Sequence, residues 1–224
     1  MATDEFAAYP VRRESWTLAG ERFDLIWPAD MDALLDDPRT RERFAREEYM
    51  PYWAVPWPSA ILLAEYVLTR HRGCGGRAIE LGCGVGLVSV AAARAGWSVT
   101  ATDWDADALK FAAENARANG VSLAGTSVLN WYESYGGPPF ELILASDLLY
   151  ERRNVGPLAR WIRAALADGG TALVSDSNRS SADGFAAAAG EAGLSVEKLA
   201  REITPPYGLL LRGTIYRLRK PVIP

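Results

Sequence analysis

The stretch from Ala78 to Asp103 reads AIELGCGVGLVSVAAARAGWSVTATD, and it decides the fold class. A short apolar segment carrying one acid leads into three glycines at alternate positions. An alanine-rich segment follows, and a second apolar segment then ends in Asp103. Glycines let the chain turn sharply, and the N–H groups at the start of the next helix point at any ligand bound there. A carboxylate at the tip of the second strand can accept hydrogen bonds from both hydroxyls of a ribose. The stretch therefore predicts a nucleoside-binding site.

The spacing of the glycines narrows the choice of nucleoside. A dinucleotide site has glycines spaced G-x-G-x-x-G, and the third of these positions is Leu87 here. Glu80 also precedes the loop, and a carboxylate would repel a pyrophosphate. A ligand with a cationic amino group, such as the methionine end of S-adenosylmethionine, is favoured by that acid. A nicotinamide-dependent oxidoreductase fits less well, and a loop that only makes a tight strand-to-helix turn is the structural alternative.

Composition limits the classes of function. The chain has 224 residues, with 24 Lys and Arg against 28 Asp and Glu, which gives a net charge of −4. We therefore expect no nucleic-acid partner, because the chain lacks the excess or clustering of Lys and Arg that a nucleic-acid-binding surface needs. The apolar runs are too short for a membrane span, and the first residues do not resemble a signal peptide, so a cytoplasmic protein is expected. Two cysteines are too few for a disulfide scaffold or a zinc cluster, and no metal site is expected.

From residue 77 onward, short apolar segments alternate with helical patterns, which is typical of a parallel α/β sheet. The apolar positions Val155, Leu158, Ile162 and Leu166 indicate a helix that ends at Gly169–Gly170. The last two strands follow each other without a helix between them, so they must pair antiparallel. The predicted strands cover 77–81, 98–102, 127–129, 140–146, 171–175, 194–200 and 209–218, with helices at 87–95, 105–119 and 181–192.

The N-terminal part is an addition to this sheet. Segments 16–18 and 23–25 flank Ala19–Gly20 as in a hairpin, and Pro38 follows Asp37, a helix-capping residue. Pro58 opens another helix with one apolar face. We expect residues 1–56 to form an extension, a hairpin plus a helix, that packs on a nucleoside-binding domain spanning 57–224.

Three further clusters are candidates for chemistry. The first is the aromatic run YWAVPWPS at 52–59, which includes Trp57. The second is Asn130–Trp131, which leaves the third strand, so that Asn130 could bond an adenine edge and Trp131 could stack on its face. The third is ASDLLY at 145–150, which leaves the fourth strand, where open α/β sheets bind ligands. Packing of the aromatic residues and capping of a helix by Asp147 are the alternative explanations.

Asp147 and Tyr150 suit an amine substrate. They are three residues apart, so one helical turn would place them on the same face. A lysine amine, with a pKa of about 10.4, costs roughly 4 kcal/mol to deprotonate near pH 7.4. A carboxylate favours the ammonium by its charge, so we expect Asp147 to hold and aim the amine rather than to deprotonate it. Tyr150 would supply a polar tip or an aromatic wall for the cation.

These motifs together resemble one enzyme family. The acid-x-Gly-x-Gly-x-Gly loop is similar to the first motif of class I, seven-strand S-adenosylmethionine-dependent methyltransferases. The segments Trp53-x-x-x-Trp57-Pro58, Asn130-Trp131 and Asp147-x-x-Tyr150 resemble the family-16 lysine methyltransferases. The likeness is strongest to the electron-transfer flavoprotein β-subunit branch. It implies a mostly parallel, seven-stranded, Rossmann-like sheet whose last strand is antiparallel.

The resemblance also implies roles for residues. Asp147 and Tyr150 would be catalytic and face the acceptor nitrogen. S-adenosylmethionine, released as S-adenosylhomocysteine, would be surrounded by Trp57, Glu80, Gly82, Cys83, Gly84, Gly86, Asp103, Trp104, Asn130, Trp131 and Ser146.

The acceptor implied by the resemblance is a lysine of a protein. A small amine methylated by the same fold and a non-catalytic cofactor-binding module are the alternatives. The chain departs from the family at Asn130, where Asp is common, and at Ser177–Asn178, where Pro-Gly is common. These departures concern the acceptor more than the donor. The oligomeric state stays open.

Overall fold

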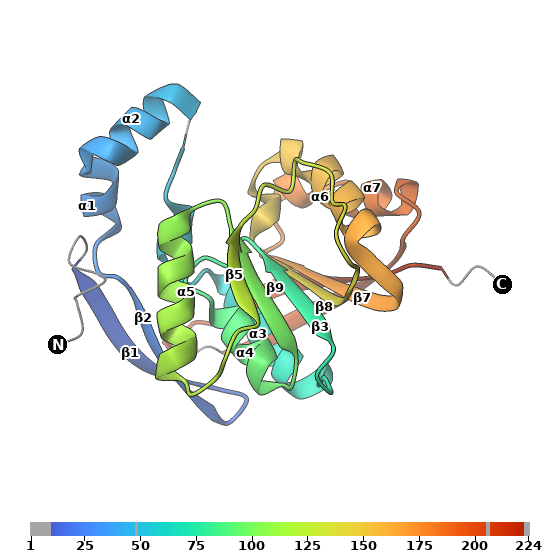
Figure 1. Ribbon diagram of the computed structural model, residues 1–224, viewed down its shortest axis with the longest axis horizontal. Coiled ribbons are helices and arrows are strands. Elements are labelled where there is room, and N and C mark those ends of the chain that lie inside the picture. The colour runs from blue at the N-terminus through green and yellow to red at the C-terminus, as the bar shows by residue number, and fades with distance from the viewer. Residues whose placement is uncertain (1–9, 48, 205–206, 222–224) are drawn as a thin grey trace.

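The computed structural model describes residues 10–47, 49–204 and 207–221 (Figure 1). Its centre is a seven-stranded sheet with the order β5-β4-β3-β6-β7-β9-β8. Strands β3 to β7 are parallel, and β9 runs antiparallel to both of its neighbours. This arrangement confirms the predicted fold class. The strands are β3 (Arg77–Leu81), β4 (Ser98–Asp103), β5 (Gly125–Val128), β6 (Phe140–Ser146), β7 (Leu166–Asp176), β8 (Ser195–Ile203) and β9 (Leu211–Arg219).

Helices cover both faces of the sheet (Figure 1). One face carries α3 (Pro58–Arg70), α4 (Leu87–Arg94) and α5 (Ala106–Ala118), and the other carries α6 (Arg152–Ala165) and α7 (Phe185–Glu191). Successive side chains of a strand point to opposite faces, so β6 supplies both cores. Leu142 and Leu144 pack with α3 and α4, whereas Ile143 and Ala145 pack with α6. The central strand β6 is therefore buried on both faces, as its nearly continuous apolar run predicts.

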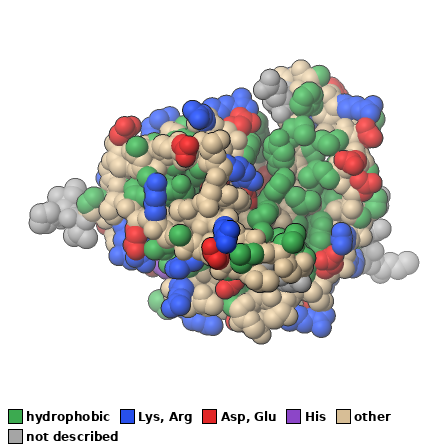
Figure 2. All heavy atoms as spheres, turned by 180° about the vertical axis from the view of Figure 1, so that it is seen from behind, with side chains coloured by type: hydrophobic (Ala, Val, Ile, Leu, Met, Phe, Trp, Pro, Cys, Tyr) green, Lys and Arg blue, Asp and Glu red, His purple; other side chains and the backbone are tan. Residues whose placement is uncertain are grey.

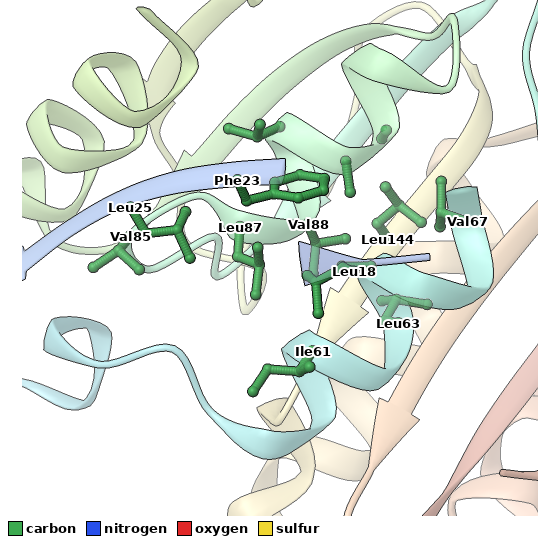
Figure 3. Close-up of a cluster of buried hydrophobic side chains, with 14 of the residues drawn as sticks. Leu18, Phe23, Leu25, Ile61, Leu63, Val67, Val85, Leu87, Val88 and Leu144 are labelled. Carbon is green, nitrogen blue, oxygen red and sulfur yellow. The ribbon is translucent and has the colours of Figure 1, made fainter. Parts of the chain in front are cut away.

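The N-terminal elements extend the first of these cores. Strands β1 (Val11–Leu18) and β2 (Glu21–Pro28) form the predicted antiparallel hairpin. Leu18, Phe23 and Leu25 from the hairpin pack against side chains of α3 and of the segment leading into α4 (Figure 3). Helices α1 (Met31–Asp36) and α2 (Pro38–Glu47) follow and project from the body (Figure 1). Seen from behind, hydrophobic side chains gather on the half of the molecule that holds this extension (Figure 2).

Hydrogen bonds fix the hairpin to α5. The amide of Asn115, fully buried, accepts from the Ile26 N–H at 2.7 Å and donates to the Ile26 carbonyl at 2.8 Å and the Val85 carbonyl at 2.7 Å. Asn119 bonds both backbone groups of Asp24 in the same way, at 3.0 Å and 2.7 Å. Because Val85 belongs to the glycine loop, the hairpin and the loop share one buried amide. The division of the chain at residue 56 stays a prediction.

The sequence prediction was wrong at the junction of α6 and β7. Leu166 was expected in the helix and the strand at 171–175, but α6 ends at Ala165 and β7 begins at Leu166. Leu166 pairs with Phe140, and after an irregularity Thr171 pairs with Leu142. The glycines therefore lie within the strand rather than between helix and strand. The predicted helix at 181–192 is also shorter, because residues 180–182 form a separate 3-10 turn, η3.

Across the described ranges, no helix combines the length and apolar character needed to cross a membrane.

Candidate functional site

A cavity of about 410 Å³ opens at the carboxyl ends of β3, β4 and β6. The chain leaves β3 toward β4 on one side, while β6 lies on the other side, so the strand order reverses here. Such a switch point is where open α/β sheets bind ligands. The cavity brings together ten of the predicted site residues, namely Trp57, Gly82, Cys83, Gly84, Asp103, Trp104, Trp131, Ser146, Asp147 and Tyr150. Three others, Glu80, Gly86 and Asn130, do not line it.

The glycine loop forms the floor of the cavity. Gly84 has φ +50°, and a Cβ placed on it would lie 3.0 Å from the carbonyl oxygen of Trp53, so a side chain would close the gap between the loop and that segment. Gly86 has φ +84° and precedes α4, and a Cβ there would lie 2.7 Å from the backbone of Ala112 in α5. Gly84 therefore keeps the cavity open, whereas Gly86 lets two helices approach each other.

Asp103 lies at the tip of β4, as predicted, and its carboxylate faces the cavity. Its Oδ2 accepts from the Gly84 N–H at 2.8 Å and its Oδ1 from the Asp105 N–H at 2.9 Å. Burial raises the pKa of Asp103 to about 6, and these backbone donors oppose the rise. Each oxygen keeps a further lone pair for a ligand hydroxyl. The next residue, Trp104, is 51% exposed at the rim.

Glu80 lies beneath the glycine loop rather than in the cavity. It is 1% exposed, and its Oε2 accepts from the Ser89 hydroxyl in the first turn of α4. Its Oε1 is buried and has no partner. Burial raises the pKa of Glu80 to about 8, because the charged form is disfavoured away from water. An unpaired buried oxygen close to the loop can accept a hydrogen bond from a ligand or a water.

Asn130 and Trp131 lie at the boundary with a second hollow of about 310 Å³. Trp131 is 8% exposed, lines both spaces, and has a buried Nε1 without a partner. Asn130 lines only the second hollow, where its Oδ1 accepts from the Tyr132 N–H at 3.0 Å. The indole is therefore placed to form a wall of the main cavity. A contact between Asn130 and an adenine stays a prediction.

Asp147 follows β6 and adopts φ +57°, a left-handed conformation that is uncommon for a residue with a side chain. It is 7% exposed, and its N–H donates to the Ser175 carbonyl at 3.0 Å. Its Oδ2 accepts from the Ser59 N–H at 3.0 Å, in the first turn of α3, and its Oδ1 accepts from the Arg179 guanidinium. Both carboxylate oxygens are thus held at a fixed position in the cavity wall.

Three aromatic rings, those of Tyr52, Trp57 and Tyr150, line the same cavity as Asp147. The ring of Tyr52 lies 5.3 Å from that of Tyr150 and 6.1 Å from that of Trp57, measured between centroids. Burial raises the pKa of Tyr150 above its ordinary value of 10, so its hydroxyl keeps its proton. Three rings beside a carboxylate can hold a cationic or methylated nitrogen by cation–π attraction.

The sequence analysis assigned no role to two residues of the site, Asp105 and Arg179. Asp105 caps α5, and its Oδ2 accepts from Arg43 of α2 at 2.7 Å and from the Tyr49 hydroxyl, which ties the extension to the cavity rim. Arg179, which pairs with Asp147, comes three residues after the end of β7. The position of Arg179 just beyond a strand end was a usable signal, but the pairing of Asp105 with α2 had none.

The residues fit S-adenosylmethionine. The gap kept by Gly84, the Asp103 carboxylate and the Trp131 indole line one cavity and suit a ligand with a ribose and an aromatic base, while the unpartnered Glu80 oxygen lies outside that cavity. The cavity volume lies in the roughly 300–1,000 Å³ range of small-molecule sites. In the described part of the chain, no group of three or more His, Cys, Asp and Glu side chains is arranged to hold a metal ion.

Comparison with known proteins points the same way. The model of a family described as lysine methyltransferase matches residues 52–186. The electron transfer flavoprotein β-subunit lysine methyltransferase of Xenopus laevis is 32% identical over 132 residues, covering 58% of this chain and 53% of that protein. Protein N-lysine methyltransferase METTL21A of Mus musculus is 38% identical over 107 residues, covering 43% and 48%. Histone-arginine methyltransferase METTL23 of Homo sapiens is 31% identical over 102 residues, covering 42% and 54%. The chain thus spans about half the length of these relatives.

Solved structures share the fold. The ribosomal protein L11 methylase of Lactobacillus delbrueckii subsp. bulgaricus superposes with a TM-score of 0.56 at 21% identity, covering 72% of this chain and 77% of the other. A TehB-like S-adenosylmethionine-dependent methyltransferase of Corynebacterium glutamicum superposes with a TM-score of 0.55 at 16% identity, covering 85% and 98%.

Proposed function

Because this chain belongs to the lysine methyltransferase family, we propose that it transfers a methyl group from S-adenosylmethionine to a lysine side chain of a protein. One observation carries the proposal. The glycine loop and Asp103 line the same cavity as Asp147 and Tyr150. A donor on the loop and an amine at Asp147 would therefore meet without a barrier between them.

The residues around the glycine loop would hold the donor. Asp103 would accept hydrogen bonds from the ribose hydroxyls, and Trp131 and Trp104 would flank the adenine. Glu80 has one free oxygen beneath the loop, and an amino cation nearby would favour its ionised form. These assignments are consistent with burial of the Glu80 and Asp103 carboxyls, since ionising a buried acid requires a partner.

The residues around Asp147 would position the nitrogen of the acceptor. In this reaction the lone pair of a neutral amine forms the N–C bond while the S–C bond of the sulfonium breaks and its electron pair stays on sulfur. Alignment of the two reacting atoms supplies much of the rate. Asp147, whose carboxylate is held by Ser59 and Arg179, would accept an N–H of the amine and aim its lone pair at the methyl group. The rings of Tyr52 and Tyr150 would face the cation that forms.

The exposed rim supports a macromolecular acceptor. Tyr52 is 42% exposed and Tyr150 is 37% exposed, so both rings reach the surface beside the cavity. A long lysine side chain could extend from a partner surface past these rings to Asp147. Most of the segment 49–57 also lines the cavity, however, and a pocket closed by the N-terminal part of the chain would suit a small amine. A small-amine methyltransferase is therefore the competing assignment, and the experiment must distinguish it from a protein methyltransferase.

The test uses methyl-labelled S-adenosylmethionine, the purified protein, and an extract of host cells that lack this gene. We expect label in one or a few discrete protein bands, with the modified residue mapped to lysine by mass spectrometry. The same extract without the protein is the control. Label confined to small molecules would support the small-amine assignment, and a methylated arginine would overturn the assignment to lysine.

A further inference from the structure

Arg179 lies on the loop between β7 and η3 and lines the cavity. Its Nη1 donates to Asp147 Oδ1 and lies 3.5 Å from Asp176 Oδ2. Its own N–H donates to Asp176 Oδ1 at 2.7 Å, so the start of this loop is fixed by the acid that ends β7. The Arg179 side chain is 31% exposed, whereas those of Asp147 and Asp176 are 7% and 1% exposed. One guanidinium thus bridges two buried carboxyls.

Arg179 offsets part of the negative charge at Asp147 before any substrate enters, and it shares its own charge with Asp176. Oδ1 faces the guanidinium, and Oδ2 accepts from the Ser59 N–H at the positive end of α3. The other ionisable groups lining the cavity are Tyr49, Tyr52, Cys83, Asp103, Asp105, Tyr150, Glu151 and Arg153. Glu151 and Arg153 form an ion pair with each other, as do Asp105 and Arg43. Asp176 is the remaining acid beside Arg179, and burial raises its pKa.

This compensation bears on the protonation state of the acceptor. An uncompensated carboxylate stabilises an ammonium, which has no lone pair and cannot accept a methyl group. A lysine with a pKa of about 10.4 is already only about one part in a thousand free amine near pH 7.4. A guanidinium beside the carboxylate repels a second cation but leaves the carboxylate oxygens able to accept an N–H bond.

We propose that Arg179 is a positioning residue that sets the charge around Asp147, so that the acceptor lysine binds there as the free amine. The lysine ammonium loses its proton to water, and the resulting amine donates one N–H to Asp147 with its lone pair free. The inference rests on the proposed function. In this proposal Arg179 does not take the proton; it acts through the carboxylate that it holds.

The experiment compares Arg179→Gln and Arg179→Lys with the wild-type protein. Arg117→Gln is the matched control, because Arg117 is an exposed arginine of α5 that pairs only with Glu114 in the described contacts. Transfer to the extract proteins is measured from pH 6.5 to 10 with saturating donor and at increasing extract concentration, and the rate extrapolated to saturating acceptor is compared at each pH, because that rate reports the bound lysine. A second readout needs no turnover: N-acetyl-lysine methylamide is titrated at pH 7 by NMR into each protein with S-adenosylhomocysteine present.

With Arg179→Gln, we expect the midpoint of the rate profile to rise by about one pH unit, a tenfold loss of rate near pH 7 that disappears at high pH. The lysine probe should bind more tightly to this variant, because the ammonium is then favoured. Arg179→Lys keeps the positive charge and should restore both wild-type values, and Arg117→Gln should leave both unchanged.

A rate that falls equally at every pH, with probe binding unchanged or weakened, would overturn the inference and assign Arg179 a purely structural role. The same holds if Arg179→Lys behaves like Arg179→Gln. If the wild-type protein labels no protein at all but Arg179→Gln still binds the lysine probe more tightly, the proposed function fails and the charge effect stands. If neither protein labels an acceptor and the probe binds both alike, both ideas fail.

Discussion

Gly86→Ala tests the packing beneath the donor site. Gly86 has φ +84°, and a Cβ on it would lie 2.7 Å from both Cα and Cβ of Ala112. A left-handed conformation costs alanine about 1–2 kcal/mol. Forcing a methyl group into the contact between α4 and α5 costs about 1–3 kcal/mol more. Loss of freedom in the unfolded chain returns about 0.4–1 kcal/mol, which leaves a net loss of about 3 kcal/mol.

Gly120→Ala is the matched control for this change. Gly120 follows α5 with φ +65°, but a Cβ on it would meet nothing within 4 Å. Only the conformational cost applies there, and the net loss should be about 1 kcal/mol. The difference of about 2 kcal/mol between the two variants is therefore the cost of the clash with Ala112.

Urea denaturation at constant pH measures both losses, and thermal denaturation gives a second reading. For a chain of this size, about 1 kcal/mol corresponds to a fall of about 2–4 °C in Tm. We expect Gly86→Ala to lower Tm by about 6–12 °C and Gly120→Ala by about 2–4 °C. Equal losses in the two variants would refute the reasoning, because the approach of α5 would then not require a glycine in the loop.

Three further predictions concern buried polar groups. Asn115→Ala should lower the free energy of unfolding by about 3 kcal/mol, because buried backbone groups of Ile26 and Val85 lose their partners; a loss below about 1 kcal/mol in urea would contradict this. Burial raises the pKa of Glu80 from 4.5 to about 8, so the folded state binds an extra proton between these values and the free energy of unfolding should fall as pH rises across that window. Glu80→Gln should remove this fall, and unchanged slopes between pH 5 and 8 would count against it. Burial raises the pKa of Asp103 to about 6, so calorimetric affinity for S-adenosylhomocysteine should weaken as pH is lowered through 6. Asp103→Asn should weaken binding at pH 7.5 at least about tenfold and remove that pH dependence, whereas wild-type affinity would exclude the ribose contact.

The parts of the fold that the sequence predicted are those set by local pattern. The loop at Gly82 to Gly86 follows from turn chemistry. The strand at Phe140–Ser146, a continuous apolar run apart from Glu141, follows from burial on both faces. The start of β7 at Leu166 does not, because an apolar residue after a helix continues the helical period as well as it begins a strand. Its pairing with Phe140, a contact distant in sequence, decides between the two.

The candidate site likewise has a part that could be predicted from the sequence and a part that could not. Asp103 ends β4 and Asp147 follows β6, and the carboxyl ends of these parallel strands lie at the same edge of the sheet, so their shared cavity was predictable from topology. Whether a side chain at such a strand reaches the cavity depends on neighbours that one segment does not reveal. Glu80 bonds Ser89 beneath the loop, and Arg179 turns back onto Asp147. Both arrangements come from packing between separate elements.

Asp147→Asn tests the central claim most directly, that one cavity holds a donor at the glycine loop and an amine at Asp147. The amide keeps the shape of the side chain and removes its charge, and Asp168→Asn, at a carboxylate that is 98% exposed, is the matched control. Donor affinity is measured by calorimetry and methyl transfer with labelled donor. We expect Asp147→Asn to bind the donor as the wild-type protein does and to lose transfer by about 100-fold, while Asp168→Asn keeps both. Transfer at the wild-type rate by Asp147→Asn would contradict the account.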